Sequence, residues 1–234
     1  MNLDYISILA GGSCPNECPF CVGRSLRKSK PIEKPHFSVN WQTFLMSYDA
    51  PEISISGSTS DPMLCNTEDL FAIINDAPQL SKSLHTAYPH LLWKYRKSLH
   101  ALNEICLSVH NYSEIEIVNE LTKYFNHQKC RTRISSVYWD KSKEILSDKF
   151  FYELFQAKIF TIRKNIFESN IEIIIPYPKI GTLYGQQLFS DNNKIIVLWD
   201  FLKANTIIKA MYLWPDGQIR EQCYWTTLHE KDII

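Results

Sequence analysis

Residues 14–21 read Cys-Pro-Asn-Glu-Cys-Pro-Phe-Cys, which places three thiols in one short run with gaps of three and two residues between them. The run lies in a loop that follows Gly11-Gly12 and the apolar stretch Leu3–Ala10. Such a cluster of soft ligands favours a soft metal centre. Iron–sulfur cubes usually take four cysteines, and structural zinc takes four ligands. Three local thiols therefore either recruit a distant fourth ligand or leave one metal corner open.

The chain around this loop alternates between strand-like and helix-like segments. Leu3–Leu9 predicts a first strand. Further strands are expected at 52–57, 83–87, 104–110, 130–138 and 160–167, and helices at 38–47, 67–76, 89–102, 113–125 and 147–158. Pro89 suits a first helical turn, and Ser113 is predicted as an N-cap. Each crossover is long enough to join parallel neighbours, so we expect an α/β fold whose cysteine loop lies at the carboxyl end of a strand.

The character of the sequence changes at residue 171. The following segments are rich in β-branched and aromatic residues and predict strands at 171–176, 182–189, 194–201, 207–214 and 218–225. Asp216-Gly217 is a strong hairpin signal. We therefore expect a domain of residues 1–170 and a β-rich extension of residues 171–234 packed on it. Four aromatic residues of the extension either pack in its core or bind substrate: Tyr184, Trp199, Tyr212 and Trp214.

The pattern Cys-x-x-x-Cys-x-x-Cys, with the aromatic Phe20 before the last cysteine, resembles the signature of the radical S-adenosylmethionine (radical SAM) enzymes. The resemblance implies that Cys14, Cys18 and Cys21 hold a [4Fe–4S] cluster whose fourth iron binds S-adenosylmethionine. It implies reductive cleavage of this cofactor to a 5′-deoxyadenosyl radical that abstracts hydrogen from a substrate. It further implies a partial (β/α)6, TIM-like barrel with an open side, and an electron donor such as flavodoxin or ferredoxin.

The radical SAM family carries a Gly-Gly-Glu-Pro segment after its second strand, where it meets the methionine amino group. Thr59-Ser60-Asp61-Pro62 occupies this position and keeps the acid–proline pair, but hydroxyl residues replace both glycines. The segment is therefore either a cofactor contact or a turn that caps the next helix. By position, the resemblance implies these cofactor-binding residues: Phe20, Gly57, Thr59, Ser60, Asp61, Ser108, His110, Arg133 and Arg163.

Composition limits the partners. The 25 basic and 25 acidic residues balance, which argues against a large nucleic acid because such binding requires a basic excess. A small-molecule or nucleotide-like substrate is expected instead, with the basic connector 24–34 as a possible phosphate contact. No apolar run approaches the roughly 20 residues of a membrane span, and no signal peptide is recognised. Seven cysteines, an odd number, favour a reducing compartment and a cytoplasmic protein.

Two alternatives stay open. The first is a structural zinc or iron–sulfur module without turnover, in which Cys65 or a histidine is the fourth ligand. The second is a degenerate radical SAM fold that binds S-adenosylmethionine without cleaving it. The chain holds no second Cys-x-x-Cys motif, which argues against an auxiliary cluster. Cys65, Cys106, Cys130 and Cys223 are each expected to be buried apolar residues rather than ligands.

Overall fold

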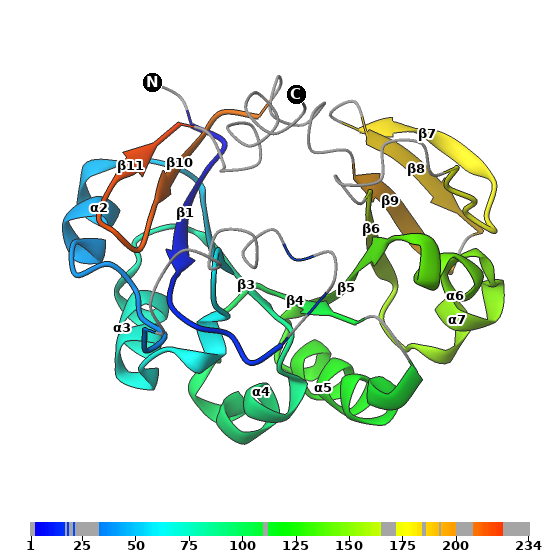
Figure 1. The fold of residues 1–234 in the computed structure, drawn as a ribbon, viewed down its shortest axis with the longest axis horizontal. Helices are drawn as coiled ribbons and strands as arrows, with labels where there is room; N and C mark the ends of the chain where they lie inside the picture. The colour runs from blue at the N-terminus through cyan, green and yellow to red at the C-terminus, as the bar shows by residue number, and fades with distance from the viewer. Residues whose placement is uncertain are drawn as a thin grey trace.

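The computed structural model describes residues 3–16, 18, 21, 33–109, 112–164, 172–183, 186–191, 193–199 and 208–221. Its main feature is one curved sheet with helices along the outer side of the curve (Figure 1). Within the described residues, six strands alternate with helices in the first part of the chain. The strands are β1 (Tyr5–Ala10), β2 (Glu52–Gly57), β3 (Ser81–Thr86), β4 (Glu104–Ser108), β5 (Arg131–Tyr138) and β6 (Ile159–Lys164).

The connecting helices lie between these strands. They are α2 (Trp41–Ser47), α3 (Thr67–Asp76), α4 (Pro89–Tyr95), α5 (Ile115–His127), α6 (Lys143–Ser147) and α7 (Lys149–Leu154), with short 3-10 turns at Pro62–Leu64, Arg96–Ser98, Tyr112–Glu114 and Asp140–Ser142. These six strands pair in parallel in chain order, from β1–β2 to β5–β6. The predicted α/β fold with six parallel strands is thereby confirmed.

The later strands extend the same sheet at both of its ends. They are β7 (Lys179–Leu183), β8 (Gln186–Ser190), β9 (Ile195–Trp199), β10 (Ala210–Leu213) and β11 (Ile219–Arg220). β9 pairs in parallel with β6, and β8 and β7 follow it in antiparallel order. β10 pairs in parallel with β1, and β11 pairs antiparallel with β10. The result is an open sheet in the order β11-β10-β1-β2-β3-β4-β5-β6-β9-β8-β7. A domain boundary at residue 170 stays a prediction.

The predicted hairpin at Asp216-Gly217 joins β10 to β11. Gly217 has a φ of 82°, a left-handed conformation that glycine adopts without strain. The Gly217 N–H donates to the Trp214 carbonyl oxygen at 2.9 Å and closes the turn.

Two predicted helices, 89–102 and 147–158, are considerably shorter in the structure than predicted. The predicted helix 89–102 ends as α4 at Tyr95, where a 3-10 turn begins. Arg96 donates from Nη1 to the Trp93 carbonyl oxygen at 2.6 Å and stacks its guanidinium on the Trp93 ring. The predicted helix 147–158 is shorter and forms α7, at Lys149–Leu154, which begins after Asp148 because the Asp148 side chain accepts from the Phe150 N–H and caps the helix; α6, at Lys143–Ser147, precedes it and was not predicted.

Other local predictions were also corrected. Ser113 is not the N-cap of α5, because a 3-10 turn at Tyr112–Glu114 precedes the helix and Glu114 occupies the cap position. Residues 172–176 form no strand, although their sequence is rich in isoleucine. The predicted strand 182–189 is a hairpin of two strands, β7 and β8.

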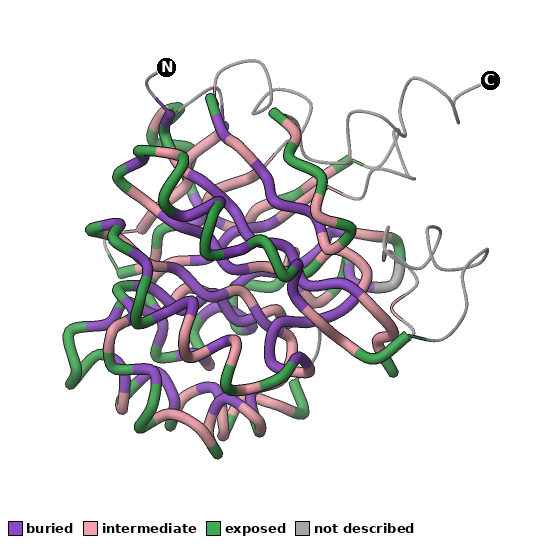
Figure 2. The backbone as a smooth tube through the Cα atoms, turned by 90° about the vertical axis from the view of Figure 1, so that its left-hand side faces the viewer, coloured by how far each residue is buried: buried purple, intermediate pink, exposed green. Residues whose placement is uncertain are grey.

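Side-chain alternation gives the sheet two different faces. On the convex face, residues such as Ile6, Ile53 and Leu84 are fully buried with the apolar sides of the helices. Full burial of such a side chain contributes about 1.5–3 kcal/mol, so this layer is the main core, the purple interior of Figure 2. The alternate positions face the concave side and are largely polar, including Ser54 and Arg133. Among the described residues, none of the helices combines the length and apolar character that crossing a bilayer requires.

Candidate functional site

The cysteine loop begins where β1 ends, and two glycines make its entry possible. Gly11 exchanges backbone hydrogen bonds of 2.9 and 3.0 Å with His36. Gly12 has a φ of 98°, and a Cβ there would lie 2.5 Å from the Lys34 carbonyl oxygen. Because no other residue tolerates both conditions, the glycine pair allows the loop to turn sharply over the edge of the sheet.

The three thiols of the loop are half-buried and form no disulfide. Cys14 Sγ lies 3.4 Å from the Tyr88 hydroxyl, which belongs to the loop after β3. Burial, followed by the contact with Cys14, raises the pKa of Tyr88, so the phenol stays protonated and can donate to sulfur. Cys21 N–H donates to the Cys18 carbonyl oxygen at 3.0 Å, which links the backbone at the second thiol to the backbone at the third.

The ligand chemistry of this loop fits an iron–sulfur cluster, because it offers three thiols that share one loop and form no disulfide. The described residues nevertheless contain no group of three or more His, Cys, Asp or Glu side chains arranged to hold a metal ion. The three sulfurs are thus not held in a preformed ligand triangle. Phe20, the predicted adenine contact, lies outside the described residues.

The loop after β2 is bonded to the cysteine loop through its hydroxyl residues. Gly12 N–H donates to Thr59 Oγ1 at 3.1 Å, and Ser60 Oγ donates to the Ser13 carbonyl oxygen at 3.0 Å. A Cβ at Gly57 would lie only 2.3 Å from the Ser60 carbonyl oxygen, so the turn requires glycine. The hydroxyls of Thr59 and Ser60 therefore join two neighbouring loops. Their contact with S-adenosylmethionine stays a prediction.

Asp61 is buried and fully hydrogen-bonded within the protein. Its Oδ1 accepts from Met63 N–H at 2.9 Å and from Thr86 Oγ1 at 2.7 Å, and its Oδ2 accepts from Ala87 N–H at 2.8 Å. Burial raises the pKa of this carboxyl to about 6, against the lowering effect of the three donors. Asp61 thus ties the loop after β2 to the loop after β3. A role toward the methionine amino group stays a prediction.

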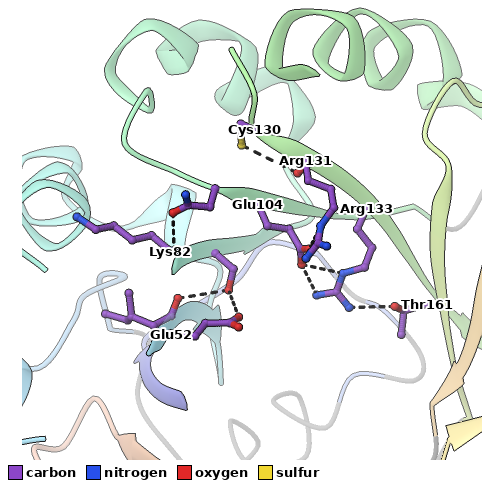
Figure 3. Close-up of polar contacts among 10 residues, drawn as sticks. Glu52, Lys82, Glu104, Cys130, Arg131, Arg133 and Thr161 are labelled. Carbon is purple, nitrogen blue, oxygen red and sulfur yellow. Dashed lines mark hydrogen bonds and ion pairs between the residues drawn. The ribbon is translucent and has the colours of Figure 1, made fainter. Parts of the chain in front are cut away.

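An ion network occupies the concave face near the start of β4 and β5 (Figure 3). Glu104 accepts from Arg133 Nε at 2.9 Å and Nη2 at 2.8 Å, and its other oxygen accepts from Arg131. Arg133 Nη1 also donates to Thr161 Oγ1 at 2.9 Å. Burial works to raise the pKa of Glu104, but Arg133 and Arg131 lower it overall. Arg133, predicted to bind cofactor, is therefore already paired with a carboxylate.

Two further polar residues of the concave face lack such partners. Arg163 on β6, another predicted cofactor contact, makes no hydrogen bond or ion pair with the described residues, and its Nε is buried. His85 on β3 likewise makes no hydrogen bond there. Burial first, and then the charges of Arg133 and Arg163, lower the pKa of His85 to about 3, so its imidazole is neutral at pH 7.

Sequence analysis did not identify His85 as a candidate. The sequence signal that could have identified His85 is its position two residues after Ser83, which places both side chains on one face of the strand. The alternate residues of this strand lie on the convex side, where they are apolar or hydrogen-bonded. Ser108, at the end of β4, lies half-buried on the same face as His85 and Arg163. His110 lies outside the described residues.

The predicted substrate-binding aromatics have different surroundings. Trp199 is half-buried and is the register partner of Arg163 on the neighbouring strand. Tyr212 and Trp214 are buried in a small second core with Leu9. The Tyr212 hydroxyl also bonds to the Tyr5 hydroxyl. Tyr184 lies outside the described residues. Contact of any of these with a substrate stays a prediction.

Fold and site together define an α/β protein with an open, curved sheet and a cysteine-bearing loop at the carboxyl end of its first strand. No family model and no curated protein matches the chain. Among solved structures, the chain is similar to Streptococcus suis SuiB bound to S-adenosylmethionine, with a TM-score of 0.57 and 14% sequence identity. The match covers 100% of this chain but only 60% of SuiB. At this identity, the likeness shows the fold alone.

Proposed function

We propose that this protein is a radical SAM enzyme that acts on a small-molecule or nucleotide-like substrate. The observation that carries the proposal is the position of the three thiols. Cys14, Cys18 and Cys21 follow the carboxyl end of β1, the end of a parallel α/β sheet where active sites gather. The fold shared with a SAM-bound protein supports the same conclusion. In this proposal the arc of β1–β6 is a partial (β/α)6 barrel, and residues 171–234 extend it.

The three cysteines would hold a [4Fe–4S] cluster. When bound, the cluster would supply the electron that cleaves S-adenosylmethionine to methionine and a 5′-deoxyadenosyl radical. The hydrogen bond from Tyr88 would orient the Cys14 sulfur and moderate its charge. The hydrogen bonds of Thr59 and Ser60 hold the cysteine loop against the loop after β2, and Asp61 holds that loop in turn against the loop after β3.

The test is anaerobic reconstitution of the full chain with iron and sulfide, followed by metal analysis and an assay for 5′-deoxyadenosine with dithionite. We expect about four irons per chain, a spectrum that S-adenosylmethionine perturbs, and release of 5′-deoxyadenosine. Replacing the three cysteines with alanine should abolish all three signals. A cluster that still assembled in this variant would refute the assignment. A reduced electron donor such as flavodoxin or ferredoxin, and a cytoplasmic setting, belong to the same proposal.

The alternative of a structural metal module has one specific weakness. Cys65, its proposed fourth ligand, is buried in the main core, and its Sγ lies 3.8 Å from the Asp61 carbonyl oxygen. Burial, followed by Asp61 and Asp69, raises the pKa of this thiol to about 12, which disfavours the thiolate that a metal requires. One zinc per chain, with no response to S-adenosylmethionine, would support the module. Binding without 5′-deoxyadenosine release would support the degenerate fold.

A further inference from the structure

The concave face of the sheet gathers side chains from three strands into one polar surface. His85 on β3, Cys106 on β4 and Arg133 on β5 are consecutive register partners, and all three point to this side. Arg163 on β6 lies close enough for its charge to act on His85 and to interact with Cys18 and Cys21. Residues far apart in the sequence therefore lie on one face of the sheet, and Arg163 is near enough to the cysteine loop to interact with Cys18 and Cys21.

The charges on this surface do not balance. Glu104 is shared between Arg131 and Arg133, whose nitrogens lie 2.6–2.9 Å from its carboxylate in these hydrogen bonds and ion pairs, so its two oxygens are occupied. Glu52 is a weak counter-ion, because burial and then Glu104 raise the pKa of its carboxyl. Arg163 has no carboxylate partner among the described residues, and its buried Nε donates to none of them. A buried guanidinium without a partner is costly, and an anion would relieve that cost.

Resting on the proposed function, we propose that Arg163 and His85 bind an anionic group of the substrate, a carboxylate or a phosphate, on the concave face. Arg163 supplies the charge, and its planar fork suits two oxygens of such a group. The neutral imidazole of His85 supplies one N–H donor. The proposal assigns Arg163 to the substrate and not to the methionine carboxylate of S-adenosylmethionine.

Hydroxyl groups surround these two residues on the same face. Ser54 and Ser135 are buried there, and Ser108 is half-buried. Trp199 stands beside Arg163 on the neighbouring strand. Arginine, imidazole, hydroxyls and an indole together suit a small acid that carries hydroxyl groups or a planar ring. They do not suit an amine, which would meet a surplus of positive charge.

The test uses the full chain, purified anaerobically, with inorganic phosphate as the probe. Phosphate is titrated at pH 7 while the histidine ring signals are followed by NMR, with His85→Asn used to assign His85. We expect a saturable change in the His85 signals, with binding weakened about tenfold or more in Arg163→Gln and partly restored in Arg163→Lys. Lys123→Gln is the control, because it removes one positive charge from the exposed surface of α5 and should bind phosphate like the wild type.

A second measurement separates a binding role from a structural one. Because Arg163 has no partner among the residues that the structure describes, Arg163→Gln should not lower the melting temperature of the phosphate-free protein, and phosphate should raise it only in variants that keep the charge. A melting temperature that falls in Arg163→Gln without phosphate would overturn the proposal in favour of a structural role.

Parallel measurements distinguish a refutation of the anion site from a refutation of the proposed function. S-adenosylmethionine binding is measured in parallel and should change less than about threefold in Arg163→Gln, against the tenfold loss for phosphate. A loss of S-adenosylmethionine binding that matched the loss of phosphate binding would overturn the assignment to substrate while leaving the radical SAM function intact. Phosphate binding that ignored Arg163 would overturn the site. Arg163-dependent phosphate binding in a protein that never cleaves S-adenosylmethionine would support the site and reject the proposed function.

Discussion

The buried carboxyl of Asp61 offers a thermodynamic test of how the loops beside the site are held. Two effects compete at this group: burial disfavours the ionised form, and three donors at 2.7–2.9 Å favour it. With burial stronger, the pKa in the folded protein is about 6, compared with an ordinary value of 3.8. The folded state then holds its proton at a pH where the unfolded chain has lost it. Stability from this group is present below about pH 4 and is lost as the pH rises through 6.

The perturbation is Asp61→Asn, which removes the titration. At about 1.4 kcal/mol per pKa unit, the difference between 3.8 and about 6 corresponds to about 3 kcal/mol in total. A small part of this free energy is already lost at pH 4, because the unfolded carboxyl begins to ionise near its pKa of 3.8. Between pH 4 and pH 7, the free energy of unfolding of the variant should therefore rise by about 2–3 kcal/mol relative to wild type. His85 is present in both proteins, so its own contribution to the pH dependence of unfolding is common to both and cancels in the difference.

The assay is urea unfolding of both proteins at pH 4, 5, 6 and 7, followed by circular dichroism. Asp49→Asn, which removes an exposed carboxyl, is the control for the substitution itself. A variant that lost stability relative to wild type as the pH rose would refute the reasoning. That result would mean that the three donors outweigh burial and that the folded-state pKa is depressed.

Three further outcomes follow from the contacts. Glu104→Ala should lower the free energy of unfolding by about 3 kcal/mol or more in urea titrations, because it leaves Arg133 buried without a counter-ion. The control Glu120→Ala, which breaks an exposed ion pair, should cost less than about 1 kcal/mol, and equal losses in the two variants would contradict this reasoning. Gly57→Ala should lower the free energy of unfolding by about 1–3 kcal/mol in the same assay, because its Cβ would lie 2.3 Å from the Ser60 carbonyl oxygen. Gly181→Ala is the control, because a Cβ at Gly181 meets nothing within 4 Å and is not expected to clash. In the reconstituted protein, Tyr88→Phe should lower the midpoint potential of the cluster in potentiometric titration, because a hydrogen bond to a ligating sulfur stabilises the reduced state. An unchanged midpoint potential would show that the hydrogen bond to Cys14 is absent.

Local sequence patterns predicted much of the first part of the fold. The strand at 52–57 and the helix at 67–76 have the predicted bounds, because their apolar alternation and caps are local features. Helix bounds were wrong where a single side chain changed the local bonding. Arg96 stacks on Trp93 and ends α4, and Asp148 caps α7, which begins two residues after the predicted start. Such competition between a side chain and the backbone is not visible in periodicity.

The candidate site likewise contains residues that the sequence identifies and residues that only the tertiary structure identifies. The three cysteines stand out in the sequence by their spacing alone. His85 does not, because a single histidine on a strand carries no motif, and it gains interest only when Arg133 and Arg163 are brought near it. Asp61 was recognised by its place before a proline, yet its three hydrogen bonds depend on the neighbouring strand end at Thr86 and Ala87.

By itself, the sequence determined the alternation of strands and helices, the three thiols at the end of the first strand and the hairpin at Gly217, because each depends on residues close together in the chain. The tertiary structure alone decided that β10 joins β1 and β9 joins β6, so that the last strands extend both ends of one sheet. It also decided that Arg163 lies close enough to His85 for their electrostatic interaction, with no counter-ion among the described residues. Both results depend on which distant strands pair and in what register, and no local pattern encodes that choice.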